Sequence, residues 1–336
     1  MNWLESDERR VYIPNEVSTL AIFGLAKNTG KTTTLNAVIE SLDEPSMALT
    51  SIGLDGEAYD QLNHLPKPRI KLKKNHIIAT AKETLTLLSC AYERLEETNI
   101  PTALGPIMIV RLHEDAEVLI AGPTTNQDLA RLLSKLKKYA KRLLIDGALN
   151  RKTFTQLKHI DGLILATGAA AGRDFNDTLA LSEATVRLFT PNPSLYEVPS
   201  EALLSVLEPT LTHYQAKDVT TLKHVLESSP PPTCLLIKGA VTDHHLKTIM
   251  KHAQQGFTLL AEDPSKWLFD HRNLRYFDHL NVRLGVLNAV KLLAVTINPW
   301  HPSNQHYCPK QFKEALQARI DVPVINVLER RLSHEA

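Results

Sequence analysis

A lysine beside two glycines is the first part of the chain that could do chemistry. In GLAKNTGKTTT, Gly24 and Gly30 precede Lys31, and an apolar helical pattern follows. Main-chain N–H groups of such a turn converge on phosphate oxygens, and the lysine ammonium neutralises their charge. The sequence therefore predicts a nucleotide phosphate site built from the main-chain amides of residues 26–33. The alternative is a capped strand-to-helix turn without a ligand.

Each side chain of this turn has an expected role. Lys31 would reach the β- and γ-phosphates, Thr32 would place its hydroxyl on Mg²⁺, and Thr33 is placed for the α-phosphate. Three threonines in a row are poor helix formers, and a helix start is where they cost least. The residues expected to contact the nucleotide here are Gly24, Lys27, Asn28, Thr29, Gly30, Lys31, Thr32 and Thr33.

Carboxylates after strand-like segments are candidates for holding Mg²⁺ or orienting a water. Asp55 and Glu57 follow the segment 47–52, and Asp146 ends the apolar run of LLIDG, the Walker B position. Each of them could instead be an ordinary helix cap or turn residue. The expected catalytic residues are Lys31, Asp55 and Asp146, and the expected Mg²⁺ ligands are Thr32, Asp55, Glu57 and Asp146.

The elements that must position these residues form an α/β pattern. Apolar runs of strand length alternate with amphipathic helices such as 126–139, which indicates a mostly parallel sheet covered by helices. We therefore predict the fold of a P-loop NTPase with an additional C-terminal α/β portion. The predicted strands of the first part are 19–23, 47–52, 106–112, 117–121, 142–145 and 162–166.

Proline-rich stretches divide the chain. We expect an N-terminal extension over 1–17, a nucleotide-binding domain over 18–190 and a helical connector over 191–232. The remaining residues, 233–336, form a C-terminal α/β portion that either continues the same sheet or makes its own.

The spacing of the two glycines narrows the class. Gly24 and Gly30 lie six positions apart, whereas the common pattern G-x-x-x-x-G-K-[ST] has five. This spacing resembles the branch of P-loop proteins that includes dethiobiotin synthetase, the ParA and MinD ATPases and the nitrogenase iron protein. Many members carry a second lysine five residues before the phosphate lysine and use it across a homodimer. Here that place is Ala26, and Lys27 could face nucleotide, substrate, partner or solvent.

The base is expected to be adenine. No [NT]-K-x-D element, typical of GTP-specific relatives, follows a strand, so ATP is favoured. Asn298 ends the strand-like run of KLLAVTINPW and resembles the adenine-contacting asparagine of the same branch. An Asn-Pro turn without a ligand explains it as well.

A closer resemblance rests on several segments taken together. They are GLAKNTGKTTTLN, TSIGLDGE, KPRIKLKKNHIIATA, ALGPIMIV, VLIAGP, LLIDGALNR, KGAVTD, INPWHPS and DVPVINV. Together they resemble the ATP-binding reactivase subunit of lysine 5,6-aminomutase over most of residues 18–328. The resemblance implies a cytoplasmic role in lysine fermentation with a MutS-like second subunit. The pair would restore an aminomutase whose adenosylcobalamin is damaged.

Composition supports some classes and excludes others. With 38 basic and 37 acidic residues, the net charge of +1 provides no global attraction to nucleic acid or an anionic membrane. Three distant cysteines, an N-terminus without a signal-peptide pattern and the lack of long apolar runs are expected of a cytoplasmic protein. A homodimer is compatible with the sequence.

Two other functions stay open. One is an ATP-dependent ligase or kinase resembling dethiobiotin synthetase, in which Lys27 and the small-residue stretch 167–172 would bind a substrate; tight backbone packing is the alternative explanation of that stretch. The other is a nucleotide-sensing module without turnover.

Overall fold

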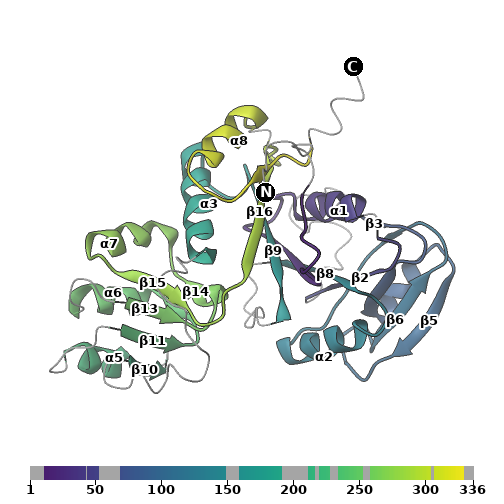
Figure 1. Cartoon of the computed structure of the whole chain (residues 1–336), viewed down its shortest axis with the longest axis horizontal. Coiled ribbons are helices and arrows are strands. Elements are labelled where there is room, and N and C mark those ends of the chain that lie inside the picture. The colour runs from purple at the N-terminus through teal and green to yellow at the C-terminus, as the bar shows by residue number, and fades with distance from the viewer. Residues whose placement is uncertain are drawn as a thin grey trace. The chain divides into compact units, whose positions relative to one another are not determined.

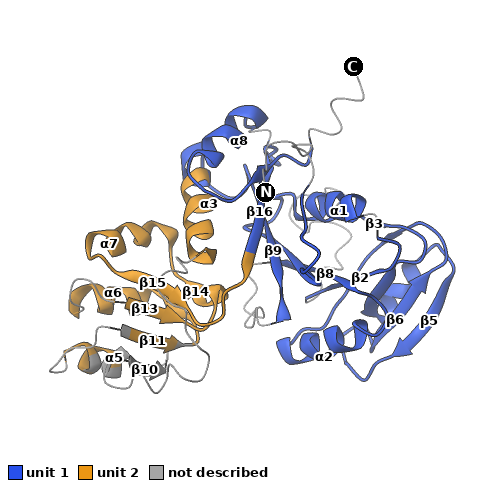
Figure 2. Cartoon of the chain, viewed as in Figure 1, with its two compact units in different colours: residues 1–154, 159–178, 292–336 blue, residues 155–158, 179–291 orange. Residues whose placement is uncertain are grey.

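The computed structural model describes residues 11–42, 44–52, 69–148, 159–190, 211–215, 219–227, 234–252, 258–303 and 306–328 (Figure 1). These residues form a mixed α/β structure with a large, mostly parallel sheet, as expected. The chain divides into two compact units (Figure 2). Unit 1 consists of residues 1–154, 159–178 and 292–336, and unit 2 of residues 155–158 and 179–291.

Unit 1 is built on a nine-stranded sheet in the order β17-β16-β9-β1-β8-β2-β4-β6-β5. Strands β1, β8, β9, β2 and β4 pair in parallel, and so do β16 and β17, whereas β6 is antiparallel to both β4 and β5. The antiparallel pairs lie at one edge. In sheet order the strands are β17 (Val324–Ile325), β16 (Lys291–Asn298), β9 (Gly162–Gly168), β1 (Thr19–Gly24), β8 (Arg142–Ala148), β2 (Met47–Ser51), β4 (Ile77–Ala81), β6 (Ile107–Leu112) and β5 (Tyr92–Glu97).

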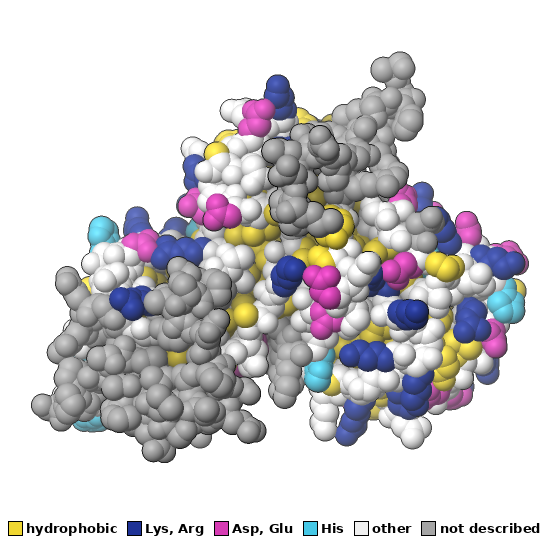
Figure 3. All heavy atoms as spheres, viewed as in Figure 1, with side chains coloured by type: hydrophobic (Ala, Val, Ile, Leu, Met, Phe, Trp, Pro, Cys, Tyr) yellow, Lys and Arg dark blue, Asp and Glu magenta, His cyan; other side chains and the backbone are white. Residues whose placement is uncertain are grey.

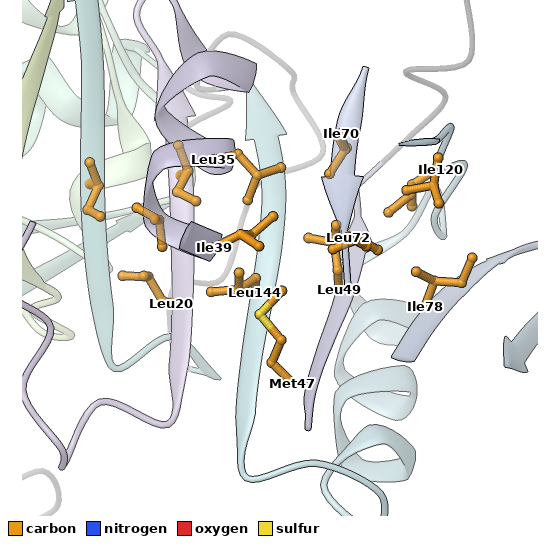
Figure 4. Close-up of a cluster of buried hydrophobic side chains, with 14 of the residues drawn as sticks. Leu20, Leu35, Ile39, Met47, Leu49, Ile70, Leu72, Ile78, Ile120 and Leu144 are labelled. Atoms are coloured by element: carbon orange, nitrogen blue, oxygen red, sulfur yellow. The ribbon is translucent and has the colours of Figure 1, made fainter. Parts of the chain in front are cut away.

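Helix α1 (Lys31–Leu42) packs one face against this sheet. Its residues Leu35 and Ile39 belong to the same buried cluster as Leu20 of β1 and Leu144 of β8 (Figure 4). Burying one such side chain stabilises the fold by about 1.5 to 3 kcal/mol. The core therefore fixes the helix that follows the glycine-rich turn.

The same cluster continues under a small two-stranded ribbon. Strands β3 (Ile70–Leu72) and β7 (Ala116–Val118) pair antiparallel, and Ile70 and Leu72 are buried while Lys71 between them is exposed. The basic stretch KPRIKLKK thus contains a strand with one solvated face, as its alternation predicts. Three further elements complete unit 1: η1 (Lys82–Leu87), α2 (Asn126–Leu136) and α8 (Pro309–Gln317).

Unit 2 contains its own parallel sheet of four strands in the order β10-β11-β13-β15. These are β10 (Leu211–Gln215), β11 (Cys234–Lys238), β13 (Thr258–Ala261) and β15 (Arg283–Val286). A buried cluster that includes Leu235, Leu259 and Phe277 forms its core. The remaining elements are α5 (Val219–Leu226), β12 (Val241–Thr242), α6 (Asp243–His252), η4 (Pro264–Lys266), β14 (Trp267–Leu268), η5 (His271–Asn273) and α7 (Leu274–His279); α3 (Phe175–Phe189) contains the boundary between the units.

Each of the six predicted strand segments overlaps a strand, although β7 shares only residues 117 and 118 with the predicted segment 117–121. Helix α2 begins at Asn126 as expected and ends at Leu136 rather than at 139. The predicted domain boundaries differ from the observed units. The portion 233–336 is divided between the two units, because β16 and β17 belong to the larger sheet, whereas β11, β13 and β15 belong to the four-stranded sheet of unit 2. The predicted helical connector also contains a strand, β10.

On the visible face, Lys and Arg side chains alternate with Asp and Glu and do not gather into one extended field of a single sign (Figure 3). In the part of the chain that the structure describes, no helix has both the length and the apolar character needed to cross a membrane.

Candidate functional site

The turn between β1 and α1 is closed by its own side chains. Asn28 and Gly30 have φ angles of 63° and 84°, in the left-handed region that glycine and asparagine tolerate best. The Thr29 hydroxyl is buried and donates to the carbonyl oxygen of Ala26 at 2.9 Å. A Cβ on Gly24 would lie only 2.9 Å from that hydroxyl oxygen. The six-position spacing of the glycines is therefore accommodated by an extra tight turn inside the loop.

Helix α1 starts directly at the end of this turn. The Thr34 N–H donates to the Gly30 carbonyl oxygen at 2.8 Å, in the hydrogen-bond pattern of an α-helix. The preceding amides, those of residues 31–33, have no carbonyl within the helix to receive them, and the helix dipole favours an anion at this end. Lys31, Thr32 and Thr33 are half-buried at the helix start.

Lys31 forms an ion pair with Asp146 of β8. The Nζ atom lies 3.2 Å from Oδ1, and the two side chains are 17% and 6% exposed. Asp146 is brought to this place by the sheet, since it pairs in register with Ile22 of β1 and Ser51 of β2. The fold thus brings Lys31 and Asp146 next to each other, as the sequence predicts, although the two residues lie far apart along the chain.

Asn298 at the carboxyl end of β16 braces the turn from the other side. Its Nδ2 donates to the carbonyl oxygen of Asn28 at 2.8 Å, and its Oδ1 accepts from the N–H of Trp300 at 3.2 Å. Added Cβ atoms on Gly30 and Gly168 would each lie 2.9 Å from the Asn298 Cβ. The asparagine is wedged between two glycines, and its amide group is engaged with the chain itself.

The small residues after β9 are explained by close backbone packing. Ala169 N–H donates to the carbonyl oxygen of Asn298 at 2.9 Å. A Cβ on Gly172 would lie 2.5 Å from the Thr178 nitrogen, so only glycine fits there. The loop thus packs tightly against its own chain.

A second close approach lies at the carboxyl end of β2. The Gly122 N–H donates to the Ser51 hydroxyl oxygen at 2.8 Å, and a Cβ on Gly122 would lie 1.8 Å from the Ser51 carbonyl oxygen. This contact fixes the segment before α2, whose first turn is capped by Thr125. It places β2, β8 and the start of α2 around one stretch of the sheet edge.

The site residues predicted from the sequence fall into three groups. The turn and helix start bring together Gly24, Asn28, Thr29, Gly30, Lys31, Thr32 and Thr33, with Asp146 and Asn298 on either side. Lys27 is exposed on the turn. Asp55 and Glu57, the predicted carboxylates after β2, lie outside the described residues.

The donors present suit Mg²⁺ in the form in which it accompanies nucleotides. Within the described residues, no group of three or more His, Cys, Asp and Glu side chains could hold a metal ion without other ligands. Mg²⁺ at phosphate sites needs only one or two protein oxygens, because phosphate and water supply the others. The buried Asp146 carboxylate already accepts one cation, the Lys31 ammonium, and the Thr32 hydroxyl lies at the same helix start. The residues therefore fit the ion.

Sequence reasoning missed the aromatic pair next to Asn298. Trp300 is 53% exposed, and its ring centroid lies 4.3 Å from that of His306 in an edge arrangement. The available signal was the tryptophan in NPWH, an aromatic residue directly after a strand's carboxyl end.

Comparisons of the chain with models of protein families, with curated proteins and with solved structures found no match. The geometry of the turn, the ion pair and the brace is therefore the basis of the functional argument.

Proposed function

We propose that this chain binds Mg·ATP at the turn between β1 and α1 and hydrolyses it to drive a conformational change in a partner protein. The observation that supports this most strongly is the Lys31–Asp146 ion pair, with 3.2 Å between Nζ and Oδ1, at the start of a helix that follows a glycine-rich turn. A strand, such a turn, a lysine and a helix in this order are typical of phosphate-binding loops.

The proposed cycle starts from the observed ion pair. When a triphosphate enters, Lys31 exchanges the Asp146 carboxylate for the β- and γ-phosphate oxygens, and the amides of residues 31–33 receive further oxygens. Bound Mg²⁺ would neutralise charge on those phosphates, with the Thr32 hydroxyl and the released Asp146 carboxylate as its protein ligands. Asp55 and Glu57 remain predictions for water orientation and Mg²⁺ binding.

The ion pair also offers a two-state element. The nucleotide can shift the chain between two conformations only by binding one of them better. The β- and γ-phosphates compete with Asp146 for Lys31, and the ion pair would form again once hydrolysis and the release of ADP have removed both. ATP would thereby change the surroundings of Asp146, between β1 and β2, in each cycle.

The partner is proposed from the sequence resemblance. We propose a reactivase role, with a MutS-like second subunit, on an adenosylcobalamin-dependent lysine 5,6-aminomutase. The chain would open the mutase so that damaged cofactor leaves and intact cofactor enters. The ligase or kinase alternative is not favoured by any contact, because the small-residue stretch 167–172 packs on its own chain.

Thermal unfolding and ATP turnover test the proposal together. At one hundred times Kd, Mg·ATP should stabilise the protein by about 2.7 kcal/mol, and each kcal/mol raises the melting temperature by about 2 to 4 °C. At the same ligand concentration, Lys31→Ala should reduce this stabilisation to about 0.4 to 1.4 kcal/mol, which corresponds to a 10- to 100-fold weaker affinity. Lys138→Ala, which removes the same charge at an exposed place beyond α2, should keep the full shift.

Turnover separates the candidate functions. Slow ATP hydrolysis that rises when the aminomutase and the second subunit are added is expected of a reactivase. Hydrolysis that requires a small-molecule substrate would contradict this role and favour a ligase or kinase. Tight binding without turnover under any of these conditions would indicate a sensor.

A further inference from the structure

An exposed tryptophan stands directly beside the proposed phosphate site. Trp300 is 53% exposed, and its backbone N–H donates to Oδ1 of Asn298. Nδ2 of the same asparagine donates to the carbonyl oxygen of Asn28 in the turn. The Asn298 side chain thus connects the backbone of Trp300 to the turn through two hydrogen bonds. A large apolar ring at such a place invites the question of what covers it.

The position of the indole is fixed by its surroundings. Pro299 before it is buried, and the Pro299 carbonyl oxygen accepts the N–H of Tyr307 at 3.0 Å. Tyr307 is anchored in turn by aromatic contacts with Phe175 and Phe312, at centroid distances of 5.0 and 5.3 Å. The segment that carries Trp300 is therefore tied to the body of unit 1.

His306 supports the indole from the same segment. Its ring packs edge-on against Trp300 at 4.3 Å, and its Nδ1 accepts the N–H of His301 at 3.3 Å. The imidazole therefore limits the rotation of the indole, and ordering the ring in advance lowers the entropy cost of a later contact.

The edge of the sheet gives the direction in which a nucleotide would extend. Lys31 and Asp146 mark the phosphate end, between β1 and β8. Trp300 follows β16, which lies on the opposite side of β1, beyond β9. Ligands of parallel sheets lie across the carboxyl ends of neighbouring strands. A nucleotide with its phosphates on Lys31 would therefore carry its base toward the β9 and β16 side.

Asn298 has only part of its hydrogen-bonding capacity left for a base. Its amide nitrogen donates one proton to the Asn28 carbonyl oxygen, and its amide oxygen accepts from the backbone N–H of Trp300, so one proton and one lone pair remain. Next to Asn298, the exposed indole ring of Trp300 presents a flat surface that a base could contact. Aromatic side chains bind bases by stacking, with little dependence on which base it is.

We propose that the indole of Trp300 is the stacking surface for the purine base of the nucleotide held by Lys31, with Asn298 as the positioning residue that ties this surface to the turn. This inference rests on the proposed function. Stacking explains how the site gains affinity from the base while the Asn298 amide holds the turn. Because stacking depends little on which base is present, Mg·ATP and Mg·GTP should gain affinity from Trp300 to a similar extent.

Affinities for Mg·ATP and for Mg·tripolyphosphate, measured by calorimetry on the full chain, test the inference. Trp300→Ala should weaken Mg·ATP binding about fivefold to a hundredfold and leave Mg·tripolyphosphate binding unchanged, because only ATP carries a base. Trp300→Phe should retain most of the ATP affinity. The control Leu87→Ala removes an exposed apolar side chain of unit 1 outside the proposed site and should change neither affinity.

The variant Asn298→Ala distinguishes the support that Asn298 gives to the turn from the stacking of the base on Trp300. It should weaken both ligands, since the turn loses the bond to the Asn28 carbonyl oxygen. Tryptophan fluorescence adds a direct readout: Mg·ATP should quench wild-type emission, and Trp300→Phe should remove that quenching.

Several results would overturn the inference. An unchanged Mg·ATP affinity in Trp300→Ala, including the case in which only capture of the second subunit is lost, would assign the indole to a protein interface. Equal losses for both ligands in Trp300→Ala would show a structural effect on the turn. Wild-type protein that binds tripolyphosphate as tightly as ATP would contradict the stack while leaving the phosphate site intact. Binding of neither ligand would remove the proposed function as well.

Discussion

The carboxyl edges of the two parallel sheets carry similar residues in different arrangements. In unit 1, Gly30 with φ 84° closes the turn after β1, and in unit 2, Gly239 with φ 96° follows β11. Each edge also has a lysine–carboxylate pair, with 3.2 Å between Lys31 and Asp146 and 3.8 Å between Lys266 and Glu262. Judged by residue type alone, both edges are candidates for an anion.

The difference lies in what the main-chain amides already contact. In unit 2, the Gly239 N–H donates to Oε2 of Glu262 at 3.0 Å, and the Glu262 carbonyl oxygen accepts both the N–H and the Nδ2 of Asn288. That edge is closed by its own carboxylate. In unit 1, the amides of residues 31–33 belong to the first turn of helix α1, and the carboxylate that pairs with Lys31 comes from the neighbouring strand β8. At the unit 2 edge, a carboxylate thus accepts the N–H of the glycine with positive φ.

The largest expected effect separates the two lysines. Lys31→Ala should weaken Mg·ATP binding by about 10- to 100-fold, because a charged hydrogen-bond donor to phosphate contributes about 1.5 to 3 kcal/mol. Lys266→Ala should leave that affinity unchanged, since its partner Glu262 closes the other edge. Calorimetric titration of both variants checks this. Equal losses in the two variants would contradict the assignment of the site to unit 1.

The two glycines give the next largest effect. Gly30→Ala should destabilise unit 1 by about 1 to 3 kcal/mol, because alanine is strained at φ 84° and its Cβ would lie 2.9 Å from the Asn298 Cβ. It should also weaken Mg·ATP binding. Gly239→Ala, strained at φ 96°, should destabilise unit 2 and spare binding.

Urea unfolding followed by circular dichroism, together with titration of Mg·ATP, measures both effects of the glycine variants. A Gly30→Ala protein with wild-type affinity would show that the turn's conformation is not needed for the ligand.

The smallest effect concerns carboxylates that serve folding. The pKa of Asp270 is lowered from 3.8 to about 2, first by its hydrogen bond with the Arg272 side chain. Because the folded state favours the ionised form, this contribution is complete above pH 3.8 and disappears as the pH falls through about 2. Asp270→Asn should reduce the unfolding free energy of unit 2 by about 0.5 to 1 kcal/mol at pH 7.

The difference between wild type and Asp270→Asn should shrink between pH 4 and pH 2. Urea titrations at several pH values measure it, read by the fluorescence of Trp267 in a background that carries both Trp3→Phe and Trp300→Phe. The Trp267 ring lies 5.9 Å from that of Phe269 in unit 2. A difference that stays constant with pH would contradict the role of the charge.

Local patterns predicted the centre of the site well. Strand β1, the turn and helix α1 are encoded within one continuous segment, where glycine positions and apolar spacing act over a few residues. Asp146 was also predicted, because an apolar run ending in an acid places that acid at the sheet edge. These features depend on short-range geometry, which a single sequence shows directly.

Long-range packing could not be predicted in the same way. For Asn298 the sequence leaves an adenine contact and an Asn-Pro turn open, and it gives no sign of the bond from its amide to Asn28, whose proximity depends on β16 lying next to β9. The antiparallel strands β5 and β6 at the sheet edge and the separate sheet of unit 2 are likewise results of strand order. Strand order depends on contacts between distant segments, which periodicity does not record.

The most direct test of the central claim is an experimental structure of the chain with Mg²⁺ and a non-hydrolysable ATP analogue. We expect the β- and γ-phosphate oxygens to lie within hydrogen-bond distance of the amides of residues 31–33, with Lys31 turned from Asp146 to the phosphates. A turn that stays closed on the Lys31–Asp146 pair, with the analogue bound elsewhere or absent at saturating concentration, would contradict it.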